Sequence, residues 1–376
     1  MPVYLKPNPS YHKRRSAESG RAGKPFVERR ARPAERLTIG LINNMGDGAL
    51  QATERQFASL LNQASAGVSI DLALYSFPGV VRGEAGARHV ETFYSSVQDL
   101  WDTRPDGIIV TGREPLTPDL RQESYWESFT RTVDWARENT CASVWSCLAA
   151  HAAVLHMDGI QRVRSQNKHF GVFECEKLAD HPLIQGASAS FKIPHSRWNG
   201  LSEQSLKTHG YEVITRAGNA GVDTFVREDK SLFVFFNGHP EYASNTLLLE
   251  YKRDVTRFVR NESQTYPLLP ENYFAPVTAD ALKTLELRAK ADPSEERVGE
   301  LAAILETMRI ESTWHETAVH IYKNWLRHIS EQKKQSQENS INCDSPSAKT
   351  PSSDRSMSSV RFPALEDTQP ACATKI

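Results

Sequence analysis

The segment ASVWSCLAAHAAVLH, residues 142–156, contains the pattern that decides the fold. Its first five residues, Ala142–Ser146, form a short apolar run that is typical of a buried strand in a parallel sheet. The Ala-rich residues 148–156 favour a helix, because alanine and leucine are strong helix formers. Cys147 therefore lies at a turn from a strand into a helix.

Further strands and helices are predicted on both sides of this segment. Thr53 is expected to cap a helix that places Phe57, Leu60 and Leu61 on one face. The other predicted helices span residues 125–139 and 244–260, and the other predicted strands span residues 37–43, 68–75, 107–111, 211–215, 223–227 and 232–237. This alternation predicts a three-layer α/β fold with a largely parallel sheet, whose ligands bind at the carboxyl ends of the strands.

The composition excludes several classes of protein. The 376 residues include 45 Lys+Arg and 46 Asp+Glu, and a net charge of −1 argues against a nucleic-acid partner. The sequence has neither an apolar run long enough to span a membrane nor an apolar secretory signal at its start, so we expect a cytoplasmic protein without a membrane partner. The five scattered cysteines predict neither a disulfide framework nor a metal site, and they fit a reducing compartment.

The charges and the polar residues divide the chain into three parts. Residues 1–36 contain ten Lys/Arg and three Glu, a net charge of +7, and we expect a flexible basic leader there. Residues 331–376 contain nine serines and four prolines, and this composition predicts a disordered tail. Residues 37–330 are then expected to form a single domain that includes C-terminal helices.

Cys147 is the strongest candidate for a nucleophile. The N-terminus of a helix lowers the pKa of a thiol and offers unpaired N–H groups to an oxyanion. The small residues Ser146, Ala149 and Ala150 would allow a sharp turn around it. A small buried core cysteine is the alternative interpretation of the same position.

His239 and Glu241 supply a second element at a strand end. They follow the predicted strand 232–237 within the segment GHPEY, residues 238–242. A histidine that faces Cys147 can take up a proton, and a carboxylate two residues later can orient that histidine. The sequence therefore predicts a Cys–His–Glu arrangement at one edge of the sheet.

Seven segments in this order resemble the MetA-type homoserine O-acyltransferases, a family with the class I glutamine amidotransferase fold, which is flavodoxin-like. They are DGIIVTG at 106–112, YW at 125–126, DW at 134–135, the Cys147 turn, KHFGVF at 168–173, PHSR at 194–197 and GHPEYASNTLLLEYKRD at 238–254. NWL at 324–326 also resembles the last helix of the family.

The resemblance implies a role for each matching residue. Cys147 would accept the acyl group from acyl-CoA, His239 would deprotonate the hydroxyl of homoserine, and Glu241 would support His239. The matching substrate-binding positions are Lys168, Ser196 and Arg253, and the backbone N–H groups of Leu148 and Gly112 would form the oxyanion hole. Acyl-CoA would be a co-substrate without any permanently bound cofactor, and the family resemblance further implies a homodimer that acts in methionine biosynthesis.

Departures from the family pattern leave the acyl donor and the acceptor open. Residues 148–151 read LAAH, where the family usually has WGAQ. Leu116 occupies a position where Glu is associated with acetyl-CoA and Gly with succinyl-CoA. Leu116 lacks a carboxylate that would repel a succinyl group, and Arg113 offers a charge to attract one, so succinyl is favoured over acetyl. Serine as the acceptor, a glutamine amidotransferase-like hydrolase and a non-catalytic binding protein are the alternatives.

Overall fold

The computed structural model describes residues 3–6, 36–306 and 308–343. The chain divides into two units, residues 1–336 and residues 337–376. The first unit contains the fold described below, and of the second only the last turns of helix α11 are described. Most of the predicted leader and of the predicted tail therefore lies outside the described residues.

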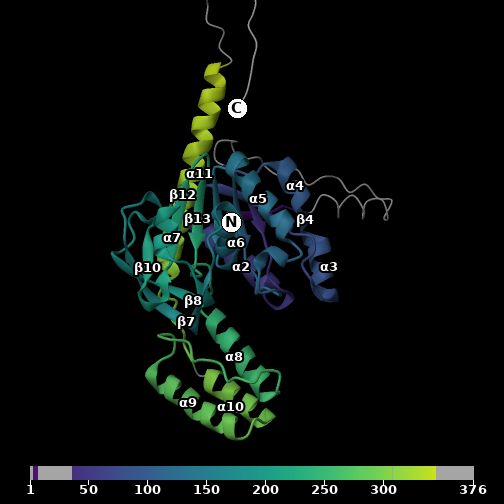
Figure 1. Cartoon of the computed structure of the whole chain (residues 1–376), viewed down its shortest axis with the longest axis vertical. Helices are drawn as coiled ribbons and strands as arrows, with labels where there is room; N and C mark the ends of the chain where they lie inside the picture. The colour runs from purple at the N-terminus through teal and green to yellow at the C-terminus, as the bar shows by residue number, and fades with distance from the viewer. Residues whose placement is uncertain (1–2, 7–35, 307, 344–376) are drawn as a thin grey trace, which may run out of the picture. The chain divides into compact units, whose positions relative to one another are not determined.

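The described residues alternate between strands and helices through the first half of the chain and end in helices (Figure 1). The strands are β1 (Val3–Leu5), β2 (Arg36–Ile42), β3 (Ser69–Ser76), β4 (Ser95–Ser96), β5 (Gly107–Thr111), β6 (Ala142–Ser146), β7 (Val163–Lys177), β8 (Ser190–Gly200), β9 (Glu212–Val213), β10 (Thr215–Ala217), β11 (Gly221–Val222), β12 (Thr224–Glu228) and β13 (Leu232–Phe236). The helices are α2 (Asp47–Ala64), α3 (Glu84–Phe93), α4 (Val97–Thr103), α5 (Trp126–Asn139), α6 (Leu148–Asp158), α7 (Glu203–Thr208), α8 (Thr246–Val259), α9 (Pro276–Ala291), α10 (Glu295–Glu306) and α11 (His315–Cys343).

A nine-stranded sheet forms the centre of the fold, in the order β1-β3-β2-β5-β6-β13-β12-β9, with β4 paired to β3. All of its pairings are parallel except those of β12 with β13 and with β9. The register aligns Thr111, Ser146 and Phe236 at the ends of β5, β6 and β13. The residues that follow these three strands are therefore brought together at one edge of the sheet.

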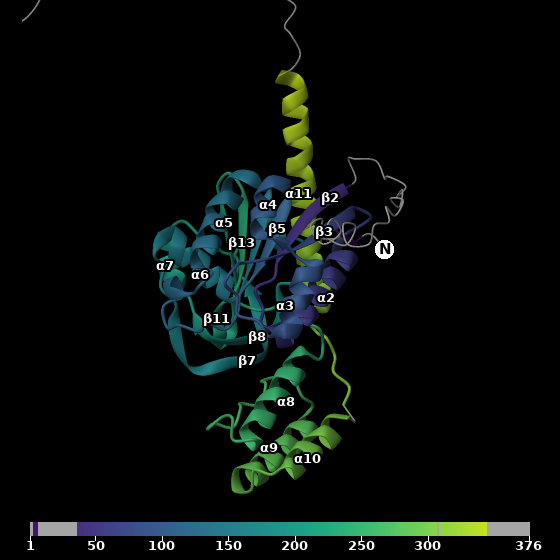
Figure 2. The same cartoon turned by 90° about the vertical axis from the view of Figure 1, so that its right-hand side faces the viewer.

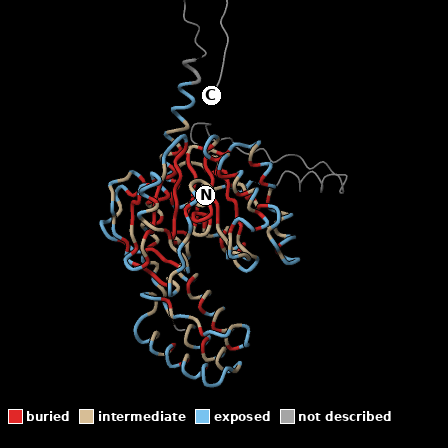
Figure 3. The backbone as a smooth tube through the Cα atoms, viewed as in Figure 1, coloured by how far each residue is buried: buried red, intermediate tan, exposed pale blue. Residues whose placement is uncertain are grey.

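Two hydrophobic cores cover the two faces of this sheet. The core that contains Ile109 and Val144 is closed by α2 and α11, and the core that contains Val110 and Trp145 is closed by α4, α5 and α6. Neighbouring strand residues thus point to opposite faces, as the strand geometry requires. Figure 2 shows these helices on opposite sides of the strands, and Figure 3 shows that the strands are the most deeply buried part. The predicted three-layer α/β fold with a largely parallel sheet is confirmed.

A second, antiparallel sheet of four strands is a feature that the sequence did not predict. Its order is β11-β10-β7-β8, and the long strands β7 and β8 pair from Val163 to Glu176 with an irregularity between Arg164 and His169. The register places Phe170 opposite Ser196. The segments KHFGVF and PHSR therefore lie side by side on this sheet.

Helices α8, α9 and α10 pack around a separate apolar cluster that includes Tyr251, Leu285 and Leu301. Trp314, which is almost fully buried in this cluster, donates a hydrogen bond from Nε1 to the Tyr242 carbonyl over 2.9 Å. This contact ties the helical cluster to the loop that carries His239.

Several sequence predictions differ from the structure in detail. Thr53 is a buried residue inside α2, which begins at Asp47, so Thr53 does not cap that helix. The strand predicted at 211–215 is divided into β9 and β10, which belong to different sheets. Residues 3–5 of the predicted leader form strand β1 against β3, and α11 continues past residue 330 to Cys343. Among the described residues, the structure has no helix that is long and apolar enough to cross a membrane.

Candidate active site

Cys147 occupies a sharp turn between β6 and α6. Its backbone has φ 51° and ψ −110°, and its N–H donates to the Phe236 carbonyl over 2.7 Å. The Cys147 carbonyl accepts from Ala150 N at 3.0 Å and from His151 N at 3.3 Å, which begins the helix directly after the cysteine. A positive φ is uncommon for a residue with a side chain, and such a turn presents a nucleophile at the end of a strand.

The predicted partners of Cys147 meet at the same sheet edge. His239 Nδ1 and Glu241 Oε1 lie 2.9 Å apart, and the Ser146 hydroxyl donates to the same carboxylate oxygen over 3.1 Å. The side chain of Cys147 lies close enough to His239 for its thiolate to raise the pKa of the imidazole. Because Nδ1 faces Glu241, Nε2 is the ring nitrogen left for the cysteine. The structure therefore brings Cys147, His239 and Glu241 together.

The charges of this group favour a protonated imidazole. Burial by itself lowers the pKa of His239, but the Cys147 thiolate and the Glu241 carboxylate raise that pKa well above its ordinary value. An imidazolium next to a cysteine stabilises the thiolate, which is the nucleophilic form.

The backbone and the ring of His239 are both held in place. The His239 N–H donates to the Pro194 carbonyl over 2.8 Å, and its ring stacks on Tyr242 with 4.2 Å between the centroids. Gly238 passes so close to Ile193 that a methyl group there would lie 2.5 Å from a side-chain carbon of that residue. Strand β8 and the loop after β13 thus orient the imidazole together.

Glu250 on α8 is the centre of a second polar group beside His239. Its Oε2 accepts from the Ser196 hydroxyl over 2.6 Å and lies 3.8 Å from Lys168 Nζ, while its Oε1 accepts from the Tyr242 hydroxyl over 2.8 Å. Lys168 Nζ also lies 4.2 Å from the centre of the Phe170 ring. The structure thus unites Lys168 and Ser196, as the resemblance implied, around a carboxylate that the sequence reasoning missed.

Arg253 lies three residues after Glu250 on α8, and its side chain is more than half exposed. Its Nε donates to Asp254 over 2.7 Å, and this hydrogen bond raises the pKa of the guanidinium, with smaller contributions from Glu250 and Glu114. Arg253 therefore lies next to the Glu250 group, but its side chain forms a hydrogen bond with Asp254 and not with Glu250.

The loop after β5 forms the other side of the site. The Gly112 N–H donates to the Ser146 carbonyl over 3.2 Å, and a methyl group on Gly112 would lie 2.7 Å from the backbone nitrogen of Ala149. Only glycine permits this approach to the start of α6, where Leu148 occupies the first helical position. Leu116 is largely exposed, and Arg113 is half-buried on the same loop. The roles of Gly112 and Leu148 in an oxyanion hole, and of Leu116 and Arg113 in acyl specificity, stay predictions.

Glu123 anchors this loop, although the sequence reasoning did not identify it. Its Oε1 accepts from the backbone N–H of Leu116 at 2.7 Å and from the N–H and hydroxyl of Thr117 at 2.8 Å each. The side chain is nearly fully buried. A glutamate in a polar loop carries no sequence signal for such a role.

One group of metal-ligating side chains occurs among the described residues, namely Cys175, His195 and Asp223. All three are buried, and Asp223 Oδ1 lies 3.2 Å from His195 Nε2. Asp223 Oδ2 accepts from Thr215 and Thr224, and Arg197 Nε donates to His195 Nδ1 over 3.3 Å. The neighbouring guanidinium would repel a cation, and burial lowers the pKa of His195 to about 4, so its ring is neutral. The group is therefore better explained as a buried polar network within the protein.

Comparison with known proteins adds to this geometry. Residues 27–336 match the model of the family "HTS: Homoserine O-succinyltransferase". The chain belongs to the homoserine O-succinyltransferase family. It is 43% identical over 305 residues to the homoserine O-succinyltransferase of Bradyrhizobium japonicum, a match that covers 81% of this chain and 93% of the relative. It is 42% identical over 297 residues to that of Rhodopseudomonas palustris, covering 79% of this chain and 89% of the relative.

Similar solved structures include a glutamine amidotransferase from Methylobacillus flagellatus, with a TM-score of 0.44, 13% identity and coverage of 78% of this chain and 95% of that chain. Another is a glutamine amidotransferase from Thermotoga maritima, with a TM-score of 0.41, 10% identity and coverage of 80% of this chain and all of that chain.

Proposed function

We propose that this protein transfers the succinyl group of succinyl-CoA to the side-chain hydroxyl of homoserine, in methionine biosynthesis, through a thioester on Cys147. The observation that carries the mechanism is the convergence of Cys147, His239 and Glu241 at the ends of β6 and β13. Membership of the homoserine O-succinyltransferase family supports the choice of substrates.

The first step forms the acyl-enzyme. The Cys147 thiolate attacks the thioester carbonyl, the bond from that carbon to the sulfur of CoA breaks, and the departing CoA thiolate takes the proton of the His239 imidazolium. The developing oxyanion lies near the N-terminus of α6, where the N–H groups of the first turn lack partners within the helix. We assign Leu148 N–H and Gly112 N–H to it, and Gly112 must exchange its hydrogen bond with Ser146 to take this role.

The second step releases the product. His239, now neutral, takes the proton of the homoserine hydroxyl while the oxygen attacks the acyl carbon. The Cys147 thiolate leaves, so the thiolate and the imidazolium are restored for the next cycle. Glu241 keeps the ring of His239 oriented through both steps, because its carboxylate holds Nδ1.

The Glu250 group is suited to the amino-acid end of the acceptor. The Glu250 carboxylate can pair with the α-ammonium group, and Arg253 offers a guanidinium fork to the α-carboxylate. Lys168 and Ser196 already contact Glu250 and would be released to orient the substrate. On the donor side, Leu116 lacks a carboxylate that would repel a succinyl group, and Arg113 on the same loop can attract it.

An assay of both half-reactions tests this function. The full chain is mixed with succinyl-CoA or acetyl-CoA, with homoserine, serine or no acceptor, and free CoA and the mass of the intact protein are followed. We expect a succinyl adduct without acceptor, homoserine-dependent turnover, and neither in Cys147→Ala. Release of ammonia from glutamine in place of acyl transfer would refute the proposal in favour of a glutamine amidotransferase-like hydrolase.

We also propose that the protein acts as a homodimer in the cytoplasm, where acyl-CoA is available. Light scattering coupled to size-exclusion chromatography checks the mass of the particle directly. A mass of about one chain would overturn the dimer without affecting the chemistry at Cys147.

A further inference from the structure

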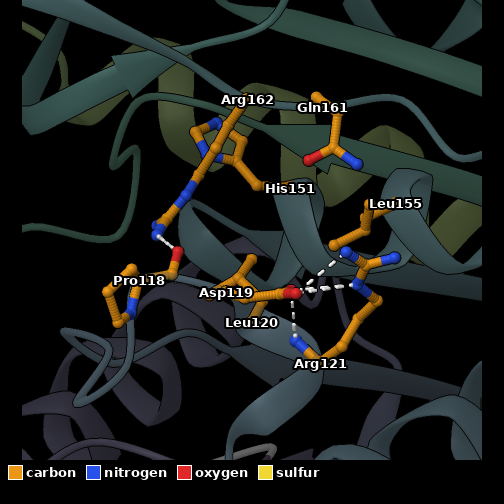
Figure 4. Close-up of a pocket in the computed structure, with 8 residues that line it drawn as sticks. All are labelled: Pro118, Asp119, Leu120, Arg121, His151, Leu155, Gln161 and Arg162. Carbon is orange, nitrogen blue, oxygen red and sulfur yellow. Dashed lines mark hydrogen bonds and ion pairs between the residues drawn. The ribbon is translucent and has the colours of Figure 1, made fainter.

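A cavity of about 290 Å³ lies beside α6, one turn beyond Cys147, and the mechanism above does not use it. Pro118 and Leu120 from the loop after β5, His151 and Leu155 from α6, and Gln161 and Arg162 line it (Figure 4). The loop that lines it is the one that carries Gly112, Arg113 and Leu116. The cavity therefore borders the side of the site that the loop after β5 forms.

His151 offers a fixed hydrogen-bond acceptor here. Asn237 Nδ2 donates to the Val222 carbonyl over 2.9 Å, which leaves Asn237 Oδ1 as the acceptor for His151 Nε2 at 2.9 Å. Nε2 therefore carries the proton, and Nδ1 keeps its lone pair. Burial lowers the pKa of His151 to about 3, with a further contribution from Arg197, so the ring stays neutral at physiological pH. His151 is only 2% exposed, and Nδ1 has no hydrogen-bond partner within the described part of the chain.

Arg162 offers a donor to the same cavity. Its Nη2 donates to the Pro118 carbonyl over 3.1 Å, which fixes the guanidinium across the cavity wall. Its Nη1 is buried and lacks a hydrogen-bond partner among the residues that the structure describes. A buried donor left in this state costs free energy, so a ligand that accepts a hydrogen bond from it gains affinity.

We propose that this cavity binds the secondary amide nearest the sulfur in the pantetheine arm of acyl-CoA. The amide N–H donates to His151 Nδ1, its carbonyl accepts from Arg162 Nη1, and Pro118, Leu120 and Leu155 contact the adjoining methylene groups. A carboxylate or a phosphate suits the cavity less well, because the Nδ1 lone pair of a neutral ring repels an anion. This inference rests on the proposed function, since it assumes that acyl-CoA is the donor.

The length of the arm fits the position of the cavity. His151 follows Cys147 by four residues on α6, a rise of about 6 Å. In acyl-CoA the first amide nitrogen is separated from the sulfur by two methylene groups, a span of roughly 4 Å from standard bond lengths. The thioester can therefore reach Cys147 while an amide occupies the cavity.

Three succinyl donors distinguish which part of acyl-CoA the cavity recognises. Succinyl-CoA carries the amides and the nucleotide, the succinyl thioester of N-acetylcysteamine carries one amide, and the succinyl thioester of pentanethiol carries none. We expect His151→Leu and Arg162→Met each to raise KM about three- to tenfold for the first two donors and to leave the third unchanged, because each variant removes one hydrogen bond. The KM for homoserine should not change, and His151→Gln, which restores an acceptor oxygen, should recover most of the loss.

His156→Gln is the matched control, because His156 is on the same helix but contacts the exposed Asp134. A penalty confined to succinyl-CoA would overturn the proposal and assign Arg162 to the phosphates of the nucleotide. A rise in KM that persists with the pentanethiol thioester would also overturn the proposal and assign Arg162 to the succinyl carboxylate. Unchanged KM values for all three donors would mean that His151 Nδ1 and Arg162 Nη1 bind water only. If His151→Leu does not fold, Arg162→Met and His151→Gln still decide the question. A wild-type protein without any acyl transfer would instead refute the proposed function itself.

Discussion

Gly238→Ala tests whether the buried network behind the active site positions His239. The added methyl group would lie 2.5 Å from Ile193 Cγ2, 2.6 Å from Asp223 Oδ1 and 2.9 Å from His195 Nε2. Carbon atoms normally stay about 3.5–4.0 Å from such neighbours, so the backbone or these groups must move by roughly 1 Å. Ile193, His195 and Asp223 are all at least 98% buried, so they cannot move away into solvent.

Two measurable effects follow from this shift. Overpacking of this kind costs about 1–3 kcal/mol, which corresponds to a fall in Tm of about 2–5 °C for a domain of about 300 residues. A misplacement of His239 by about 1 Å is expected to lower kcat about 100-fold. Differential scanning fluorimetry measures the first effect, and the rate of CoA release at saturating substrates measures the second.

Gly299→Ala is the matched control for this substitution. Gly299 lies in α10, and nothing outside its own helix lies within 4 Å of the position of an added methyl group. Alanine there should stabilise the protein by about 0.5–1 kcal/mol, because it removes the entropic cost of a helical glycine. If Gly238→Ala also keeps the wild-type Tm and kcat, the network does not position His239 and the steric argument is wrong.

Three further predictions concern single carboxylates. Because the folded pKa of His239 is raised, the stability that its charge contributes is present below its unfolded pKa and is lost as pH rises through the folded value. Glu241→Gln lowers that folded pKa, so in urea-unfolding curves the loss of stability should move to lower pH. The kcat should also fall at least 100-fold. An unchanged pH dependence of stability would contradict the pairing of His239 with Glu241. Glu123→Ala leaves the backbone N–H groups of Leu116 and Thr117 without their acceptor, and we expect a KM for succinyl-CoA raised several-fold with an unchanged KM for homoserine, as initial rates would show. Glu250→Gln should raise the KM for homoserine at least tenfold while the succinyl adduct forms at the wild-type rate in mass spectra, and a slower adduct would place Glu250 in the first step.

The sequence patterns were sufficient for the parallel core and the catalytic group. Strands β5 and β6 have the predicted bounds because both are buried on two faces and read as continuous apolar runs. The rule that ligand-binding residues follow the strands then placed Cys147 and His239 at one edge, and the register of β6 with β13 confirms their proximity.

Features that depend on distant contacts could not be predicted in this way. Strand β7 mixes exposed and buried residues without a regular alternation, so its periodicity does not indicate a strand. Glu250 resembles a solvated helix residue in the sequence, and its importance comes from Ser196, which lies 54 positions earlier. Helix α2 begins after Gly46, which offers no side-chain cap, so the true start of this helix carries no capping signal in the sequence, whereas Thr53 inside the helix does.

At Cys147, the backbone conformation that presents the nucleophile also reduces the stability of the fold. With φ at 51°, this residue occupies a region that glycine enters without steric cost and that a residue with a Cβ enters only under strain. Glycine at position 147 would therefore give a more stable protein that cannot form a thioester, whereas alanine would keep the strain and lose only the sulfur. Selection for stability alone would remove the nucleophile, so the cysteine persists at this turn only as long as its reactivity is needed.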